Sequence, residues 1–279
     1  MGTRQRILLA LAVAAVALLT LSAGAAAKTT SQSDSAGGVT ATFSYSGSPP
    51  MVSGAHLQIT RAGQIAYDQA VDSPRFCHLL CWPGAFGAHS RSVRVIRLAP
   101  GGQPDVVLEL YSGGAHCCSI DQVFSYSPIT STYVKTEHYF GNPPGVLRRL
   151  GTARRWRFVS SDDSFYYAFT DFADSGAPIQ IWSFSGRAFV NVTRHYPNLI
   201  AADAARWLRF FNHDLANGVG LIAAWAADEE LLGHDKRVQS LLAAEARRHD
   251  LRAGGTGLAT GKRFITKLNR FLHRLGYRH

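Results

Sequence analysis

The stretch Ser92–Tyr126, SVRVIRLAPGGQPDVVLELYSGGAHCCSIDQVFSY, decides the fold class. Within it, short runs of β-branched, aliphatic and aromatic residues alternate with polar residues, and clusters of Gly, Pro and Ser separate the runs. This pattern is typical of short antiparallel strands joined by tight turns. It predicts strands at Ser92–Leu98, Val106–Tyr111 and Gln122–Tyr126.

The same pattern extends in both directions, from Val39 to about Pro197. The stretch Trp156–Thr193 shares the layout of Ser92–Tyr126, because a strand, a turn with Asp or Gly and a second strand follow one another in each. An approximate repeat of this kind suggests stacked sheets or propeller-like blades. The other predicted strands are Val39–Tyr45, His56–Arg61, Thr132–Tyr139, Trp156–Ser160, Phe165–Thr170, Ile179–Phe184 and Phe189–Thr193.

Near Asn198 the periodicity becomes helical. We expect helices at Asp203–Leu215, Gly220–Leu232, His234–Leu251 and Gly261–Leu275. The predicted fold class is therefore α+β: an antiparallel β-blade, propeller-like or sandwich body over residues 39–197, followed by a small all-helical C-terminal domain over 198–279. Strands and helices do not alternate, which argues against a Rossmann or barrel scaffold.

The amino terminus has the features of an export signal. Arg4 and Arg6 precede an apolar run from Ile7 to Leu21, and small residues follow up to Ala27. This order is typical of a signal peptide over residues 1–27, and the run is shorter than the roughly 20 residues of a spanning helix. We expect a secreted or extracytoplasmic protein with no transmembrane segment in the mature form. Residues 28–38, rich in Ser, Thr and Gly, are predicted to be a flexible leader.

Four segments carry a family resemblance. Gly101–Cys118 (GGQPDVVLELYSGGAHCC) is similar to the strand-turn-strand unit of FG-GAP or VCBS-type repeats. Together with Ser161–Phe169 (SDDSFYYAF), Ser175–Trp182 (SGAPIQIW) and Val192–Pro197 (VTRHYP), it resembles a group of secreted actinobacterial proteins to which no activity is assigned. The resemblance implies a propeller-like or blade-like β domain. Calcium-binding repeats of this class carry D-x-D-x-D-G, whereas this turn has Asp105 as its one carboxylate, too few for calcium.

Composition and motifs bound the function. The chain has 279 residues, of which 46% are hydrophobic, and this is enough for a substantial core. No G-x-S-x-G, H-E-x-x-H or G-x-x-x-x-G-K-(S/T) motif occurs in the sequence. We therefore expect an exported, non-enzymatic binding or surface-interaction module without a cofactor, whose ligand the sequence does not identify.

Cys77, Cys81, Cys117 and Cys118 are expected to form disulfides, because exported proteins reside in oxidising compartments. Cys117 and Cys118 are adjacent in a segment that reads as extended, where successive side chains point to opposite faces. We therefore predict that each of them pairs with Cys77 or Cys81. Two alternatives are a redox-active pair and a metal site that also uses His78 and His116, although the C-x3-C spacing does not favour zinc.

Asp162, Asp163, Asp171 and Asp174 form a local acidic cluster next to Tyr166 and Trp182. One interpretation is turn residues that flank strands. Another is a site for a sugar, a peptide or a cation. The same carboxylates carry the alternative function, an envelope hydrolase of the glycosidase type, which needs two carboxylates facing one cleft.

Positive charge gathers at the C-terminal end of the chain. Between Glu245 and His279 there are nine Lys or Arg and two acidic residues. This basic patch is either a solvated helix face or an adhesive surface for an anionic cell-envelope polymer or a protein. We expect no nucleic acid partner, because no base-reading module accompanies the charge. The residues of the patch are Lys262, Arg263, Lys267, Arg270 and Arg274.

Overall fold

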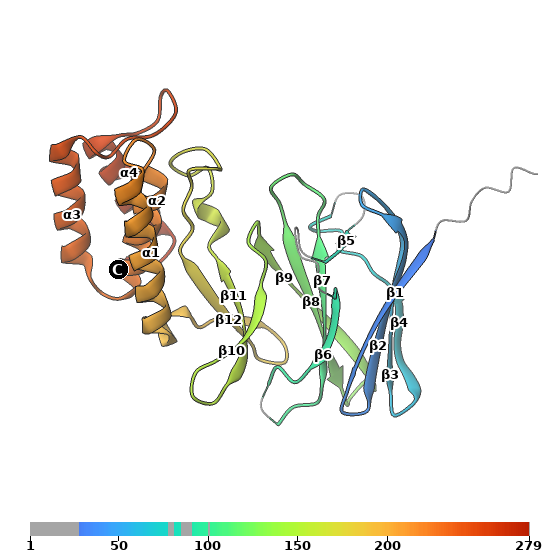
Figure 1. Cartoon of the computed structure of the whole chain (residues 1–279). Helices are drawn as coiled ribbons and strands as arrows, with labels where there is room; N and C mark the ends of the chain where they lie inside the picture. The colour runs from blue at the N-terminus through green and yellow to red at the C-terminus, as the bar shows by residue number, and fades with distance from the viewer. Residues whose placement is uncertain (1–27, 78–80, 85–90, 100, 279) are drawn as a thin grey trace, which may run out of the picture.

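The structure, a computed structural model, describes residues 28–77, 81–84, 91–99 and 101–278. The predicted signal peptide, residues 1–27, lies outside the described residues. Three antiparallel sheets and the helical region follow one another as layers across the molecule (Figure 1). The α+β class is confirmed. Within the described residues the sheets stay separate and do not close into a propeller.

The first sheet contains β1 (Thr29–Ala36), β2 (Val39–Ser48), β3 (Met51–Arg61) and β4 (Gln64–Ala70), in that order. The prediction of a flexible leader at residues 28–38 is wrong, because β1 pairs with β2 over its whole length. Hydroxyl pairs join the two strands, with Ser33 2.9 Å from Thr42 and Ser35 2.9 Å from Thr40. The Ser and Thr residues that resemble a linker in composition form a cross-strand polar ladder instead.

The middle sheet contains β5 (Trp82–Pro83), β6 (Val93–Ile96), β7 (Asp105–Tyr111), β8 (Ser119–Ser127) and β9 (Thr132–Gly141). Every residue of β7 is buried. Val106, Leu108 and Leu110 pack into a core shared with the first sheet. Val107 packs into a core shared with the third sheet. Because successive side chains point to opposite faces, β7 contributes to two cores at once.

Asp105, the one carboxylate of the turn before β7, forms two hydrogen bonds within the fold. Its Oδ2 accepts a hydrogen bond from the backbone N–H of Leu98 (3.1 Å), and its Oδ1 accepts one from the hydroxyl of Ser125 (2.5 Å). Burial raises the pKa of this carboxyl group. The one carboxylate of the turn is therefore used to join β8 to the segment that follows β6.

The third sheet contains β10 (Val146–Leu150), β11 (Arg155–Ser161), β12 (Ile179–Phe184) and β13 (Phe189–Asn191). The predicted strand at Phe165–Thr170 is wrong. The segment begins with a short 3-10 helix, η1 (Asp163–Phe165), and continues as turns. Phe165 and Phe169 pack edge-on against Phe271, at 4.9 and 5.1 Å between ring centroids. Their burial against the helices, rather than strand pairing, accounts for the aromatic pattern.

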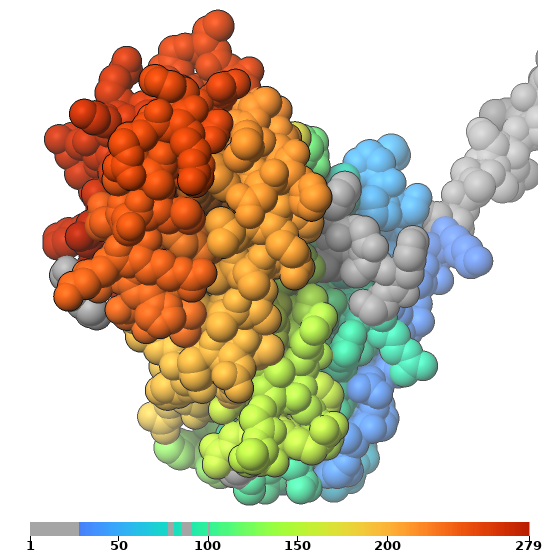
Figure 2. All heavy atoms as spheres, turned by 60° about the vertical axis from the view of Figure 1, so that its left-hand side comes forward, coloured from blue at the N-terminus to red at the C-terminus, as the bar shows by residue number. Residues whose placement is uncertain are grey.

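A second 3-10 helix, η2 (Thr193–His195), leads into four helices: α1 (Pro197–His213), α2 (Val219–Leu231), α3 (Asp235–Arg248) and α4 (Gly261–Arg274). They form one lobe against the strands of the third sheet (Figure 2). The apolar helix α2 lies inside this lobe, with Trp225 fully buried. A side chain at Gly220 would meet the backbone oxygen of Asp174 at 2.3 Å, so this glycine permits α2 to approach the β11–β12 loop. Among the described residues, no helix has the length and apolar character needed to cross a membrane.

The predicted cross-pairing of the cysteines is wrong. Cys77 is bonded to Cys81, with 5.4 Å between their Cα atoms, and Cys117 is bonded to Cys118. The prediction failed because it assumed that residues 112–118 are extended, whereas they form a tight turn in which Gly114 N donates to Cys117 O (2.8 Å).

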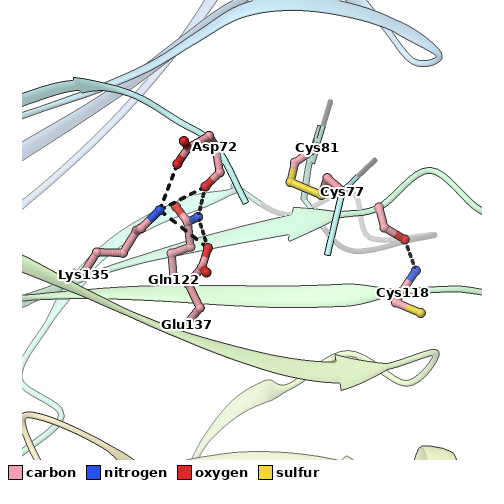
Figure 3. The surroundings of a disulfide bond; sticks show 8 residues. Asp72, Cys77, Cys81, Cys118, Gln122, Lys135 and Glu137 are labelled. Carbon is pink, nitrogen blue, oxygen red and sulfur yellow. Dashed lines mark hydrogen bonds and ion pairs between the residues drawn. A yellow bond between two sulfur atoms is a disulfide. The ribbon is translucent and has the colours of Figure 1, made fainter. Parts of the chain in front are cut away.

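A buried polar network, and not a disulfide, joins the chain before Cys77 to the middle sheet (Figure 3). The side-chain amide of Gln122, which is fully buried, donates to Asp72 O (2.6 Å) and to Glu137 Oε1 (2.7 Å). Lys135 Nζ lies 3.0 Å from the carboxylate of Asp72 and 3.6 Å from that of Glu137. Both contacts of the Gln122 amide nitrogen and those of Lys135 Nζ have acceptors, whereas Gln122 Oε1 is buried without a hydrogen-bond partner among the described residues.

The observed pairing makes a direct prediction for peptide mapping. Trypsin cleaves after Arg91, Arg94 and Arg97, which lie between the two cysteine pairs. A digest without reduction should therefore contain the two pairs in separate peptides. Because the Cys77–Cys81 loop is short, the double change to Ser should lower the free energy of unfolding by about 2 kcal/mol. One peptide mass that joins the segments on both sides of Arg94 would refute the pairing.

His138 of β9 makes the junction of the middle and third sheets sensitive to acid. Its ring lies 4.5 Å from that of Phe189 and 4.3 Å from that of Trp182. Burial lowers the pKa of His138 to about 4. The imidazole of His138 takes up a proton near pH 6.5 in the unfolded chain, but only near pH 4 in the folded protein. The free energy of unfolding therefore decreases as the pH falls from about 6.5 to 4. In the wild type, this group should lower the free energy of unfolding by on the order of 2 kcal/mol between pH 7 and pH 4.5. His138→Phe should abolish this decrease, as measured by urea unfolding at the two pH values. An unchanged difference between the two pH values would show that His138 is not responsible.

Asp228 of α2 has the opposite effect. It is fully buried, and burial, together with the neighbouring Asp203, raises its pKa well above the usual range. The folded state therefore keeps a proton that the unfolded chain loses, and stability falls as the pH rises above about 4. Asp228→Asn removes the ionisable group with little change in shape. It should raise the free energy of unfolding at pH 8 by on the order of 1 kcal/mol, and by less at pH 5. Equal gains at both pH values would contradict this explanation.

Candidate functional site

Two of the segments that carry the sequence motifs meet at one end of the middle and third sheets. The cysteine loop, residues 112–118, joins β7 to β8, and the acidic loop, residues 162–178, joins β11 to β12 (Figure 1). The ring of His116 stacks on Phe172 with 4.3 Å between centroids, and Phe172 stacks on Tyr166 at 4.8 Å. Two segments about 50 residues apart in the chain are thus in direct side-chain contact.

The end of β9 contacts both loops. The hydroxyl of Tyr139 lies 3.0 Å from Cys117 Sγ and 2.6 Å from Cys118 Sγ. Three residues later, the backbone N–H of Asn142 donates to Asp163 Oδ1 (2.7 Å). Between them, Gly141 has a positive φ of 79°, and a side chain there would lie 2.1 Å from Asp163 Cγ. The close approach of the acidic loop to β9 therefore requires glycine at this position.

The cysteine loop is held by its own hydrogen bonds. Ser112 Oγ accepts from the backbone N–H of Cys118 (2.7 Å), and Ser112 N donates to Cys118 O (2.9 Å). The hydroxyl of Tyr111 donates to Gly114 O. His78, one residue of the metal hypothesis, lies outside the described residues. The described part of the chain contains no group of three His, Cys, Asp or Glu residues arranged to hold a metal ion.

A hollow of about 590 Å³ opens beside the cysteine loop. We call it the aromatic hollow, because Phe76, Trp82 and Tyr139 form its walls together with the Cys117–Cys118 pair. Phe76 stacks on Tyr139 at 5.2 Å, and Trp82 lies 5.8 Å from Tyr111. Its volume is in the range of small-molecule sites, which are largely apolar with a few polar groups. The remaining residues of its lining are Pro50, Arg75, Ser112, Gly113 and Gly114.

The aromatic hollow includes residues that sequence reasoning overlooked. Phe76 and Trp82 flank the Cys77–Cys81 pair, a segment from which only the cysteines and His78 were singled out. Gly113 explains how Trp82 reaches the cysteine loop, since its φ is 88° and a side chain there would lie 3.0 Å from the indole. The sequence feature that could have identified these residues is the position of two aromatic side chains directly beside a closely spaced cysteine pair.

The structure separates the predicted acidic cluster into different roles. Asp162 is buried, its Oδ1 accepts from Ser164 N (3.0 Å), and its Oδ2 accepts from the hydroxyl of Tyr277 (2.8 Å). Asp171 Oδ1 accepts from the backbone N–H of Asp174, and both residues lie in the loop between η1 and β12. Burial raises the pKa of Asp163, the member next to β9.

The two aromatic residues of the predicted site, Tyr166 and Trp182, lie in different surroundings. Tyr166 is half-buried and lies in the acidic loop together with Asp163. Burial raises the pKa of the Tyr166 hydroxyl group, and the charge of Asp163 raises it further. Trp182 lies in β12 against His138, and its indole N–H donates to Gln180 (3.2 Å). Asp163 and Tyr166 are thus close to each other, whereas Trp182 belongs to the packing between sheets. The hydrolase alternative stays a prediction.

The five residues of the basic patch are exposed on α4. A hollow of about 440 Å³ is lined by four of them, Arg263, Lys267, Arg270 and Arg274. Two of the cations also have a structural role. Lys267 Nζ donates to Ala168 O and lies 5.2 Å from the ring of Phe169, and the guanidinium of Arg274 lies 5.2 Å from that of Phe271. Binding of a polymer or protein to this face remains a prediction.

Comparison with known proteins gives one distant relative. No family model and no solved structure matches the chain. A protein of Synechocystis sp. described as a probable thylakoid lumen protein is 27% identical over 158 residues, which is 50% of this chain and 43% of that protein. The chain therefore spans less than half of the relative's length. The match is a distant similarity to a probable thylakoid lumen protein and assigns no family.

Proposed function

We propose that this chain is an extracytoplasmic binding module that takes a carbohydrate ring in the aromatic hollow. The observation that carries the proposal is the lining itself, in which Phe76, Trp82 and Tyr139 stand together with the Cys117–Cys118 pair. Aromatic side chains supply large, rigid contact areas for little loss of conformational entropy. The apolar faces of sugar rings stack on such surfaces, and hydroxyl groups at their edges need nearby donors and acceptors.

The rim of the aromatic hollow supplies these polar groups. Arg75 is exposed and places its guanidinium 5.1 Å from the ring of Phe76, where it can donate several hydrogen bonds. The hydroxyl groups of Tyr139 and Ser112 lie in the same lining. Arrangements of an apolar floor with a few polar groups give orientation as well as affinity.

The compartment is part of the same proposal. The sequence begins with a segment typical of an export signal, and the distant relative is described as lumenal. Two disulfides in the described residues are consistent with an oxidising compartment outside the cytoplasm. Polysaccharides of cell envelopes occur in this location, which makes them the natural class of ligand.

Titration with oligosaccharides tests the proposal. The probes are chito-, cello- and malto-oligosaccharides, followed by tryptophan fluorescence and calorimetry. We expect at least one series to bind, and Trp82→Ala to weaken it about tenfold or more, because the stacking surface is lost. Arg75→Ala, an exposed change that leaves the core intact, should weaken it several-fold.

A matched control uses an aromatic residue elsewhere. Phe210 on α1 is 46% exposed and does not line the aromatic hollow, so Phe210→Ala should bind like the wild type. Circular dichroism and thermal unfolding establish that each variant is folded. The proposal fails if no series binds the wild type, or if both the Trp82 and the Arg75 variants bind as tightly as the control.

A further inference from the structure

A second cationic surface lies far from the aromatic hollow. The sequence RRLGTARRWR, residues 148–157, contains five arginines and no acidic residue. It forms the hairpin of β10 and β11, whose turn lies at the opposite end of the sheets from the cysteine and acidic loops (Figure 1). We call residues 148–157 the arginine hairpin. From the sequence, the C-terminal helix was interpreted as a candidate cationic binding surface, and this hairpin was not.

The arginine hairpin forms one wall of a hollow of about 500 Å³. Four guanidinium-bearing residues line it: Arg149, Arg154 and Arg155 from the hairpin and Arg97 from the segment after β6. Arg149 stacks over Trp156, with 4.9 Å from its guanidinium carbon to the ring. Gly37 and Pro104 also line it, and a side chain at Gly37 would lie 3.0 Å from Pro104 Cγ and 3.5 Å from Arg97 Nη2. The four arginines therefore line one concave space.

The charge of this hollow is uncompensated within the described residues. None of the four arginines takes part in an ion pair there, and no Asp or Glu of the described chain belongs to the lining. Their neighbour Arg157 differs, because its guanidinium donates to Tyr196 and to a backbone carbonyl. Like charges gathered in a concave site repel one another and raise the local concentration of anions.

The backbone of the turn indicates how the site can be changed without loss of the fold. Arg154 has a φ of +45°, a conformation that residues other than Gly, Asn and Asp rarely adopt, three residues after Gly151 at +71°. Ala62 and Ser131 adopt similar values, 48° and 53°, in two other hairpin turns. Glycine adopts this conformation without strain, so Arg154 can be replaced by glycine.

We propose that this hollow is a binding site for an anion that carries two or more phosphate groups. Guanidinium groups present paired N–H donors that match phosphate oxygens in two-pronged contacts, which an ammonium group cannot reproduce. Four such groups carry more positive charge than a single phosphate neutralises. The hollow shares no lining residue with the aromatic hollow, so it is separate from the carbohydrate site proposed above.

The test measures binding of tripolyphosphate by calorimetry, with inorganic phosphate and citrate as further probes. The wild type should bind tripolyphosphate more tightly than either of the other two. The hairpin variant Arg154→Gly/Arg155→Gln should bind it about tenfold or more weakly. Glycine suits the backbone at residue 154 and residue 155 is exposed, so this variant keeps the fold.

The control removes the same charge from positions outside both cationic hollows. Arg187→Gln/Arg247→Gln changes two exposed arginines that line neither the arginine-hairpin hollow nor the α4 hollow, and it should bind tripolyphosphate like the wild type. A loss in this control with no loss in the hairpin variant would overturn the proposal, as would equal binding of citrate and tripolyphosphate.

Vesicles distinguish the source of the phosphate. The same three proteins are sedimented with phosphatidylcholine vesicles that contain cardiolipin, a lipid whose headgroup carries two phosphate groups. Binding of either probe that depends on the hairpin supports the site, and the probe that shows it identifies a soluble phosphate ester or a lipid headgroup. The absence of hairpin-dependent binding to both probes would refute it.

Discussion

Burial of β7 on both faces is the constraint on which the rest of the structure depends. All seven of its residues are buried, with Leu108 and Leu110 in one core and Val107 in the other. A strand buried on two sides requires a layer on each side, and the first and third sheets are those layers. The positions of the cysteine loop and of the acidic loop follow, because each leaves the end of a strand whose place in this stack is set.

The layers give the two ends of the sheets different chemistry. At one end, the loops bring together aromatic rings, the Cys117–Cys118 pair and carboxylates that are used largely for local hydrogen bonds. At the other end, the arginine hairpin and Arg97 surround a cationic hollow. A neutral ring ligand and a phosphate-bearing ligand therefore have separate candidate positions on one body, and neither depends on the helical lobe for its walls.

Much of the fold could be predicted from the sequence, because in many segments the spacing of apolar residues matches the surface that the segment buries. The alternation in Val39–Phe43, where Val39, Ala41 and Phe43 are buried, and the helical spacing of Phe264, Leu268 and Phe271 each match a buried surface. The errors arise where long-range contacts override local pattern. Phe165 and Phe169 look like strand residues but pack into the helices, and β1 looks like a linker but gains a partner in β2. Local composition holds no information about either partner.

The candidate site was harder to predict for the same reason. The cysteine and acidic motifs could each be singled out, but their contact through His116 and Phe172 depends on how two sheets stack. Trp82 enters the site from a third segment through the space left by Gly113. Arg149 and Arg155 lie six residues apart on the two strands of one hairpin, yet they share their hollow with Arg97, which is distant in the chain.

Amide hydrogen exchange tests the central claim most directly, namely that the doubly buried middle sheet organises the molecule. The amides of β7 and β8 should exchange most slowly, near the global unfolding limit, while those of the outer strands β1 and β4 exchange faster through local opening. Exchange in β7 as fast as in β1 or β4 would contradict the account, because the two cores would then not depend on a common strand.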